Sequence, residues 1–104
     1  MTHYLVVIAR IPEMTPALAE YSKAVHGLVH HFGGRYMMLG GPEDLLEGQW
    51  PEAQRLIVSA WDSREALLRF WHSDEYQRQT KPLRENSGDY DVVIFEASSL
   101  SPPD

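Results

Sequence analysis

Two stretches of the chain, one near each end, are apolar on both sides when drawn as extended strands. In residues 4–11 the side chains of Leu5, Val7, Ala9 and Ile11 face opposite to those of Tyr4, Val6 and Ile8. In residues 90–97, Val92 and Ile94 oppose Val93 and Phe95. Strands of this kind are typical of sheets covered on both faces.

Between these strands, the spacing of apolar residues predicts two helices and two further strands. Residues 16–32 are apolar at helical spacing, begin after Thr15-Pro16 and end at Gly33-Gly34, a good pair of start and stop signals. Residues 35–39 and 55–61 read as strands, joined by a polar hairpin-like stretch.

The second helix is expected from a capping box over residues 62–65, with Asp62 in the place of the usual serine or threonine. Ser73 predicts a second cap, followed by a short extra turn that ends before Pro82.

The resulting order, β-α-β-β-α-β, predicts an α+β fold of the ferredoxin-like type: a four-stranded antiparallel sheet with both helices on one face. We expect one domain over residues 1–97 and a flexible tail over residues 98–104. The second face of the sheet has no helix to cover it, and an apolar patch of that size is typical of an interface. The simplest closure is a homodimer packed sheet to sheet.

Composition narrows the classes of function. The 104 residues contain no cysteine, which excludes disulfides and thiolate chemistry. The net charge of −6 argues against a nucleic-acid partner. We recognise neither a signal peptide nor a membrane span, so we expect a cytoplasmic protein. We also predict no metal and no cofactor, because no nucleotide fingerprint is present and His26 and His30 read as a solvated helix end.

Several short motifs occur in a characteristic order: Gly33-Gly34-Arg35, Gly40-Gly41, Leu46-Glu47-Gly48-Gln49-Trp50, the apolar strand opened by Arg55, Ser63 with Ala66, Trp71-His72-Ser73-Asp74-Glu75-Tyr76, and Pro82-Leu83-Arg84. In this order they resemble domain-of-unknown-function family 1330, a branch of the dimeric α/β-barrel superfamily. The resemblance covers residues 4–97 and implies a ferredoxin-like protomer and a sheet-to-sheet homodimer. The superfamily includes haem-degrading and quinol monooxygenases and muconolactone isomerase-like enzymes, but no general reaction is assigned to this branch.

Two positions depart from that family's pattern. Leu39 stands where the family usually has arginine, and Ala60 stands where it usually has an acidic residue. If these two positions face each other across neighbouring strands, the arginine and the acidic residue of other members would form an ion pair. This chain lacks both partners, so neither charge is left buried and unpaired. We therefore expect a cleft that is more apolar than in other members.

The candidate site residues come from side-chain chemistry and from the resemblance. His72 is the candidate general base, with an exposed histidine at a helix end as the alternative. Arg35, Arg55 and Arg84 match positions of the family and suit anion binding, with loop-fixing ion pairs as the alternative. The aromatic residues expected to line a pocket are Tyr36, Trp61 and Tyr76, whereas Tyr21 and Trp71 lie at helix-stripe positions and are expected to pack in the core.

Three functions fit these residues. One is an enzyme that acts on a small hydrophobic or carboxylated metabolite in a cleft between sheet and helices. Another is a non-catalytic ligand-binding or stress-related dimer, and the third is a structural dimerisation module. A dead-ended cavity lined by His72, an arginine and aromatic residues, with a ligand bound in it, favours the first two functions, and a solid core without a cavity favours the third.

Overall fold

The computed structural model describes residues 2–97, and the predicted tail over residues 98–104 lies outside this range. Its elements are β1 (His3–Arg10), α1 (Pro16–His31), β2 (Arg35–Gly40), β3 (Gln54–Trp61), α2 (Arg64–Trp71) and β4 (Asp89–Glu96). Between α2 and β4 the chain forms a π-helical turn (Glu75–Thr80) and a 3₁₀ turn (Lys81–Arg84). The predicted element order is confirmed.

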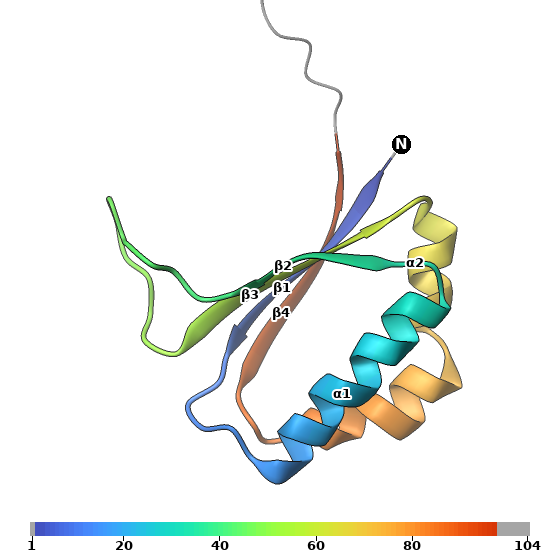
Figure 1. The fold of residues 1–104 in the computed structure, drawn as a ribbon, viewed down its shortest axis with the longest axis horizontal. Helices are drawn as coiled ribbons and strands as arrows, with labels where there is room; N and C mark the ends of the chain where they lie inside the picture. The colour runs from blue at the N-terminus through green and yellow to red at the C-terminus, as the bar shows by residue number, and fades with distance from the viewer. Residues whose placement is uncertain (1, 98–104) are drawn as a thin grey trace, which may run out of the picture.

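The strands form one antiparallel sheet in the order β2-β3-β1-β4. Figure 1 shows that α1, α2 and the turns between α2 and β4 all lie on the same side of this sheet. This is the ferredoxin-like βαββαβ arrangement that the sequence predicts.

The register of the strands decides which residues face the helices. Val7 lies between Ile57 and Val92 on the helix side. Val6 lies between Val58 and Val93 on the other side, which no described element covers. This open face also carries Tyr4, Ile8, Leu56, Met38 and Phe95. Both faces of the sheet are therefore apolar, as the alternating pattern predicts.

A β-bulge in β2 changes the side on which Leu39 lies. The register shifts between Tyr36 and Met38, so Leu39 pairs with Ile57 and faces the helices. Ala60 is three residues from Ile57, and its side chain therefore lies on the open face. The expectation that residues 39 and 60 face each other is wrong, because one extra residue in a strand moves every later side chain to the opposite face.

Hydrogen bonds at the helix ends explain where the helices begin. The hydroxyl of Thr15 accepts a bond from the amide of Leu18 at 3.1 Å, as expected for the predicted N-cap. In α2 the cap is Ser63, which accepts from the amide of Ala66 at 3.1 Å. The sequence reading placed this cap one residue too early, at Asp62; that carboxylate instead pairs with Arg35 at 3.5 Å.

Ser73 caps the next turn as predicted, since its hydroxyl accepts from the amide of Tyr76 at 3.1 Å. The helical chain does not end before Pro82, however. Pro82 lies inside the 3₁₀ turn at its first positions, where a missing amide hydrogen costs no helical bond.

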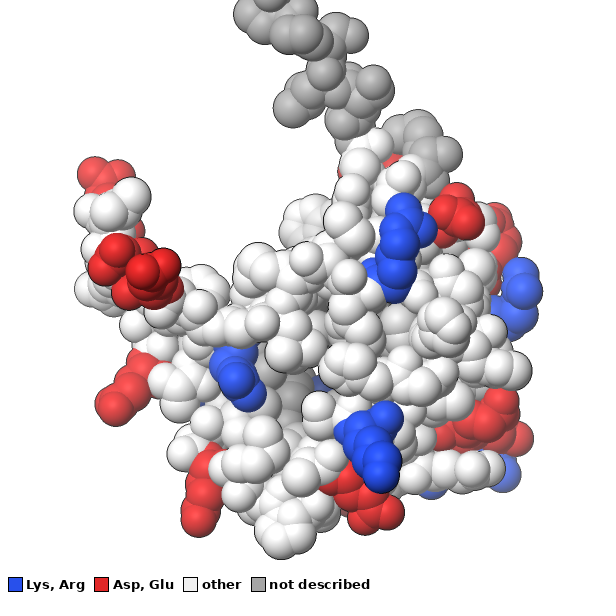
Figure 2. Space-filling model, viewed as in Figure 1, with Lys and Arg blue, Asp and Glu red and all other residues white. Residues whose placement is uncertain are grey.

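The loop between β2 and β3 projects away from the body of the protein (Figure 1). It carries Glu43, Asp44, Glu47 and Glu52, and acidic side chains gather along it in Figure 2. Basic side chains are scattered over this face of the molecule and form no continuous patch. Within residues 2–97, no helix is both long enough and apolar enough to cross a membrane.

Candidate functional site

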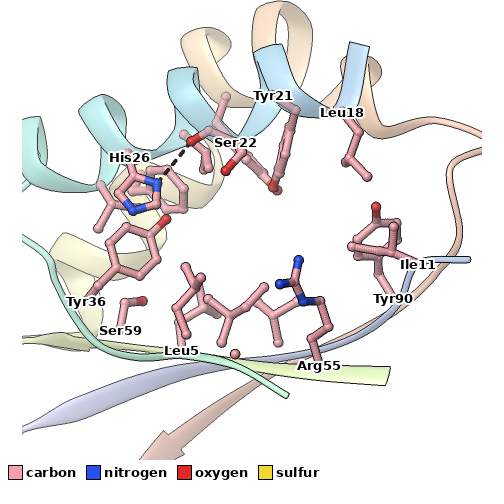
Figure 3. A pocket seen from close by; sticks show the side chains of 18 of the residues that line it. Leu5, Ile11, Leu18, Tyr21, Ser22, His26, Tyr36, Arg55, Ser59 and Tyr90 are labelled. Atoms are coloured by element: carbon pink, nitrogen blue, oxygen red, sulfur yellow. Dashed lines mark hydrogen bonds between the residues drawn. The ribbon is translucent and has the colours of Figure 1, made fainter. Parts of the chain in front are cut away.

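A cavity of about 100 Å³ lies between the helix side of the sheet and the helical layer. Figure 2 shows the surface hollowed where α1 faces the sheet, and Figure 3 shows side chains from both layers around the hollow. Aliphatic and aromatic side chains dominate the lining. The lining residues are Leu5, Val7, Ile11, Met14, Leu18, Tyr21, Ser22, Val25, His26, Val29, Tyr36, Leu39, Gly40, Arg55, Ile57, Ser59, Phe70, Trp71, Tyr76 and Tyr90.

Two tyrosine hydroxyls meet at this cavity. Tyr21 comes from α1 and Tyr76 from the π-helical turn, and their hydroxyl oxygens are 3.0 Å apart, so that one donates to the other. The turn is stabilised by Thr80, whose hydroxyl donates to the carbonyl of Glu75 at 2.8 Å. Helical turns of the π type are rare and occur frequently at functional sites.

Burial keeps the phenols of Tyr21 and Tyr36 protonated. Removal from water raises the pKa of Tyr21 far above its ordinary value, and the neighbouring Tyr76 raises it further. Burial, with a smaller contribution from Tyr76, also raises the pKa of Tyr36 to about 12. Tyr21 and Tyr36 therefore act near neutral pH as hydrogen-bond donors, not as phenolate bases.

His26 stacks on Tyr36, with ring centres 4.4 Å apart and planes at 28°. Its Nδ1 lies 3.0 Å from the carbonyl oxygen of Ser22 (Figure 3). Since a carbonyl can only accept, Nδ1 carries the hydrogen, and in a neutral ring Nε2 is the acceptor. The sequence reading placed His26 on a solvated helix end; the ring is exposed, but it also forms part of the cavity wall.

Arg55 is the one cationic side chain among the lining residues. It extends from β3, and its guanidinium reaches into the space below Tyr21 in Figure 3. No hydrogen bond or ion pair joins this guanidinium to any residue in the described part of the chain. A fixed positive charge therefore faces a mainly apolar cavity.

Arg84 lies behind the cavity wall. Its side chain is only 7% exposed, and its Nε is buried without a hydrogen-bond partner among residues 2–97. The guanidinium carbon lies 4.2 Å from the ring centre of Tyr90 and 5.8 Å from that of Tyr21. Both rings line the cavity, so Arg84 is held against it by cation–π contacts.

The remaining candidates lie away from the cavity. His72 is the exposed C-cap of α2, and Arg35 forms its exposed ion pair with Asp62. Trp61 is fully buried, stacks on Phe70 and donates its indole hydrogen to the hydroxyl of Ser59 at 3.0 Å. None of these three side chains forms part of the cavity wall.

Among the residues singled out in the sequence, the fold thus brings Tyr36, Arg55 and Tyr76 to one cavity and places Arg84 behind it. Tyr21 and Trp71, which their helix-stripe positions assign to the core, also line the cavity, and no sequence signal points to Tyr90, Ser22 or His26. Tyr21 follows the apolar stripe of its helix, and a stripe position alone does not separate a core ring from a cavity wall. Within the described residues, no group of three metal-binding side chains is present.

The fold and this site define a ferredoxin-like α+β protein with a cavity between sheet and helices. The chain belongs to the family described as a domain of unknown function (DUF1330), whose model matches residues 2–98. A sequence comparison with curated proteins found no match.

Solved structures with the same fold have little sequence identity with this chain. RPA0582, a protein of unknown function from Rhodopseudomonas palustris, is 18% identical over 97% of this chain and 84% of its own, with a TM-score of 0.72. SnoaB, a cofactor-independent oxygenase from Streptomyces nogalater, is 13% identical over 98% of both chains, with a TM-score of 0.58. At these identities the likeness concerns the fold alone.

Proposed function

We propose that the cavity binds a small hydrophobic molecule that carries one carboxylate, with Arg55 as the contact for the negative charge. The observation that carries this proposal is the guanidinium of Arg55, which faces the cavity without a described acidic partner. A guanidinium forms paired hydrogen bonds with a carboxylate, and aliphatic and aromatic walls suit the rest of such a ligand.

The volume of the cavity supports a ligand built on a single ring. At about 100 Å³ it is smaller than an engineered protein cavity of about 150 Å³ that accepts benzene, so it takes one ring at most, and the ring's substituents extend toward the open side of the hollow. Substituted benzoates are therefore suitable probes, and 4-isopropylbenzoate combines one carboxylate with an apolar group at the opposite end of the ring.

Replacement of the cavity arginine tests the proposal. We expect Arg55→Gln to weaken binding of 4-isopropylbenzoate about 10- to 100-fold in isothermal titration calorimetry, since hydrogen bonds to charged groups contribute about 1.5–3 kcal/mol. The neutral 4-isopropylbenzamide should bind the wild type and this variant equally. Arg69→Gln, at an exposed position of α2, is the matched control and should leave both affinities unchanged. Equal benzoate affinity in the wild type and Arg55→Gln would contradict the proposal.

The proposal applies to an enzyme as well as to a non-catalytic binder, and the cavity favours both over a purely structural module with a solid core. An oxygenase and a protein of unknown function share this fold, so the similarity of fold does not distinguish an enzyme from a non-catalytic binder. The role of His72 as a general base stays a prediction, and its side chain does not form part of the cavity wall.

We also propose that the protein is a homodimer in which the open sheet faces pack together. The support is the apolar open face, on which Val93 and Phe95 are 45% and 53% exposed in the single chain. Their cross-strand neighbours Val6 and Tyr4 are also apolar, and a contiguous exposed patch of this kind is typical of an interface. A second copy supplies a complementary surface of the same chemistry.

A further inference from the structure

We propose that the hydroxyl pair of Tyr21 and Tyr76 recognises an oxygen acceptor on the ligand, so that the ligand is a hydrophobic carboxylate with a carbonyl group at its other end. This inference rests on the proposed binding of a carboxylate at Arg55. It adds the chemical class of the second polar group, which neither the family nor the fold assigns.

Counting hydrogens shows that the pair has one donor to spare. Each phenol carries one hydroxyl hydrogen, and the 3.0 Å bond between the two oxygens uses one of them. The other hydrogen has no acceptor among the described residues, although both side chains line the cavity. A ligand with a correctly placed oxygen would satisfy this donor, and an apolar ligand would leave it without a partner.

The hydroxyl pair and the Arg55 guanidinium reach the cavity from opposite layers of the fold. In Figure 3 the hydroxyl of Tyr21 reaches down from α1, and the guanidinium of Arg55 reaches up from β3. The rest of the lining is mainly apolar, with Leu5 on β1 and Ile57 on β3 on the sheet side. A ligand that satisfies both groups therefore has its charge near the sheet, its acceptor near the helical layer and an apolar middle.

Arg84 gives the pair a preference for an electron-rich oxygen. Its buried guanidinium lies behind Tyr21, 5.8 Å from the ring centre, and no described carboxylate neutralises it. Burial dominates and raises the pKa of Tyr21, but the positive charge of Arg84 lies near the pair and attracts negative charge on a bound oxygen. It therefore favours a carbonyl oxygen, and most of all an oxygen that gains negative charge during a reaction.

Two benzoates of similar shape test the inference: 4-acetylbenzoate, which has a carbonyl, and 4-isopropylbenzoate, which has a methyl group in the place of that oxygen. We expect the wild type to bind the acetyl compound about three- to tenfold more tightly, the size of one net hydrogen bond. A cavity without a donor would prefer the isopropyl compound, because burial of an unpaired carbonyl is unfavourable.

The variants give a pattern that a purely structural pair would not produce. Tyr21→Phe and Tyr76→Phe each leave one hydroxyl with its own hydrogen, so each single variant should keep the preference for the acetyl compound. The double variant removes both hydroxyls and should prefer 4-isopropylbenzoate. Arg69→Gln, at an exposed position of α2 outside the cavity wall, is the control and should keep the wild-type preference.

A second measurement needs no variant. The carbonyl stretching band of 4-acetylbenzoate, followed by infrared spectroscopy with a ¹³C label, should move to lower wavenumber in the wild-type complex. Binding of both benzoates without a preference, an unshifted carbonyl band, or a double variant that still prefers 4-acetylbenzoate would each overturn the role of the pair and leave the Arg55 proposal standing. Failure of 4-isopropylbenzoate to bind would overturn the proposed function itself, and this inference with it.

Discussion

Gly34 gives the clearest case of one residue that the fold requires. A Cβ atom at this position would lie 2.5–2.7 Å from three atoms of the buried Trp61 ring. Real Cβ atoms do not approach other atoms this closely, so the ring or the backbone would have to move. In the sequence, Gly33-Gly34 reads as a helix stop; Gly33 takes that role at φ +95°, and Gly34 makes room for the indole.

We therefore expect Gly34→Ala to lower the free energy of unfolding by about 2 kcal/mol through overpacking. Gly27→Ala is the matched control, because Gly27 lies inside α1 with no atom within 4 Å of an added Cβ. It should raise the free energy of unfolding by about 0.5–1 kcal/mol through helix propensity. Urea denaturation checks both values, and equal stability of the wild type and Gly34→Ala would contradict this account.

Arg55 and Arg35 lie on opposite faces of the sheet, and this difference is also decided at the scale of single residues. Both arginines are candidate anion binders by chemistry, but side chains alternate along a strand. Arg55 lies on the same face of β3 as Ile57 and Ser59, which line the cavity. Arg35 pairs with Ala60 on the opposite face of the sheet. Residue type predicted the chemistry, and strand register decided which arginine meets the cavity.

At the scale of elements, α1 and all four strands follow from sequence patterns to within a few residues. The π-helical turn over residues 75–80 does not, because its wider turn has no simple sequence signature and results from local packing. The bulge in β2 is similar: nothing in the four apolar and aromatic residues of that strand marks the extra residue.

Ser73 links the end of α2 to the turn that carries Tyr76. Its hydroxyl donates to the carbonyl of Phe70 at 2.7 Å and accepts from the amide of Tyr76 at 3.1 Å. Ser73→Ala should lower the free energy of unfolding by about 1 kcal/mol and should also weaken binding of 4-isopropylbenzoate, because the turn positions a side chain of the cavity.

Ser63→Ala is the control for this element. Ser63 caps α2 through the amide of Ala66, away from the turn, so its loss should cost about 1 kcal/mol of stability without an effect on the benzoate. Urea denaturation and calorimetry separate the two effects. Unchanged benzoate affinity in Ser73→Ala would show that the turn tolerates the loss of its cap.

At the scale of the whole molecule, the open face provides the test of the dimer. Val93 is exposed in the single chain, so Val93→Glu should leave the protomer folded. In a sheet-to-sheet dimer the same carboxylate would be buried without a partner at a cost of several kcal/mol, which raises the dissociation constant at least about 100-fold.

Size-exclusion chromatography with light scattering measures this change. The wild type should elute as a dimer at micromolar concentration and Val93→Glu as a monomer. Ala17→Glu adds the same charge at an exposed position of α1 and should remain dimeric. A monomeric wild type at this concentration would contradict the proposed assembly.

The sequence by itself determined the element order, the ferredoxin-like class and the two apolar faces of the sheet, because these depend on periodicities of 2.0 and 3.6 residues that are visible along the chain. Only the tertiary structure decided that Tyr21, Tyr76 and Arg55 share a cavity and that His72 and Trp61 do not. The physical reason is that a cavity depends on strand register, a bulge and the volume left between packed layers. These quantities are set by contacts between residues that lie far apart in the sequence.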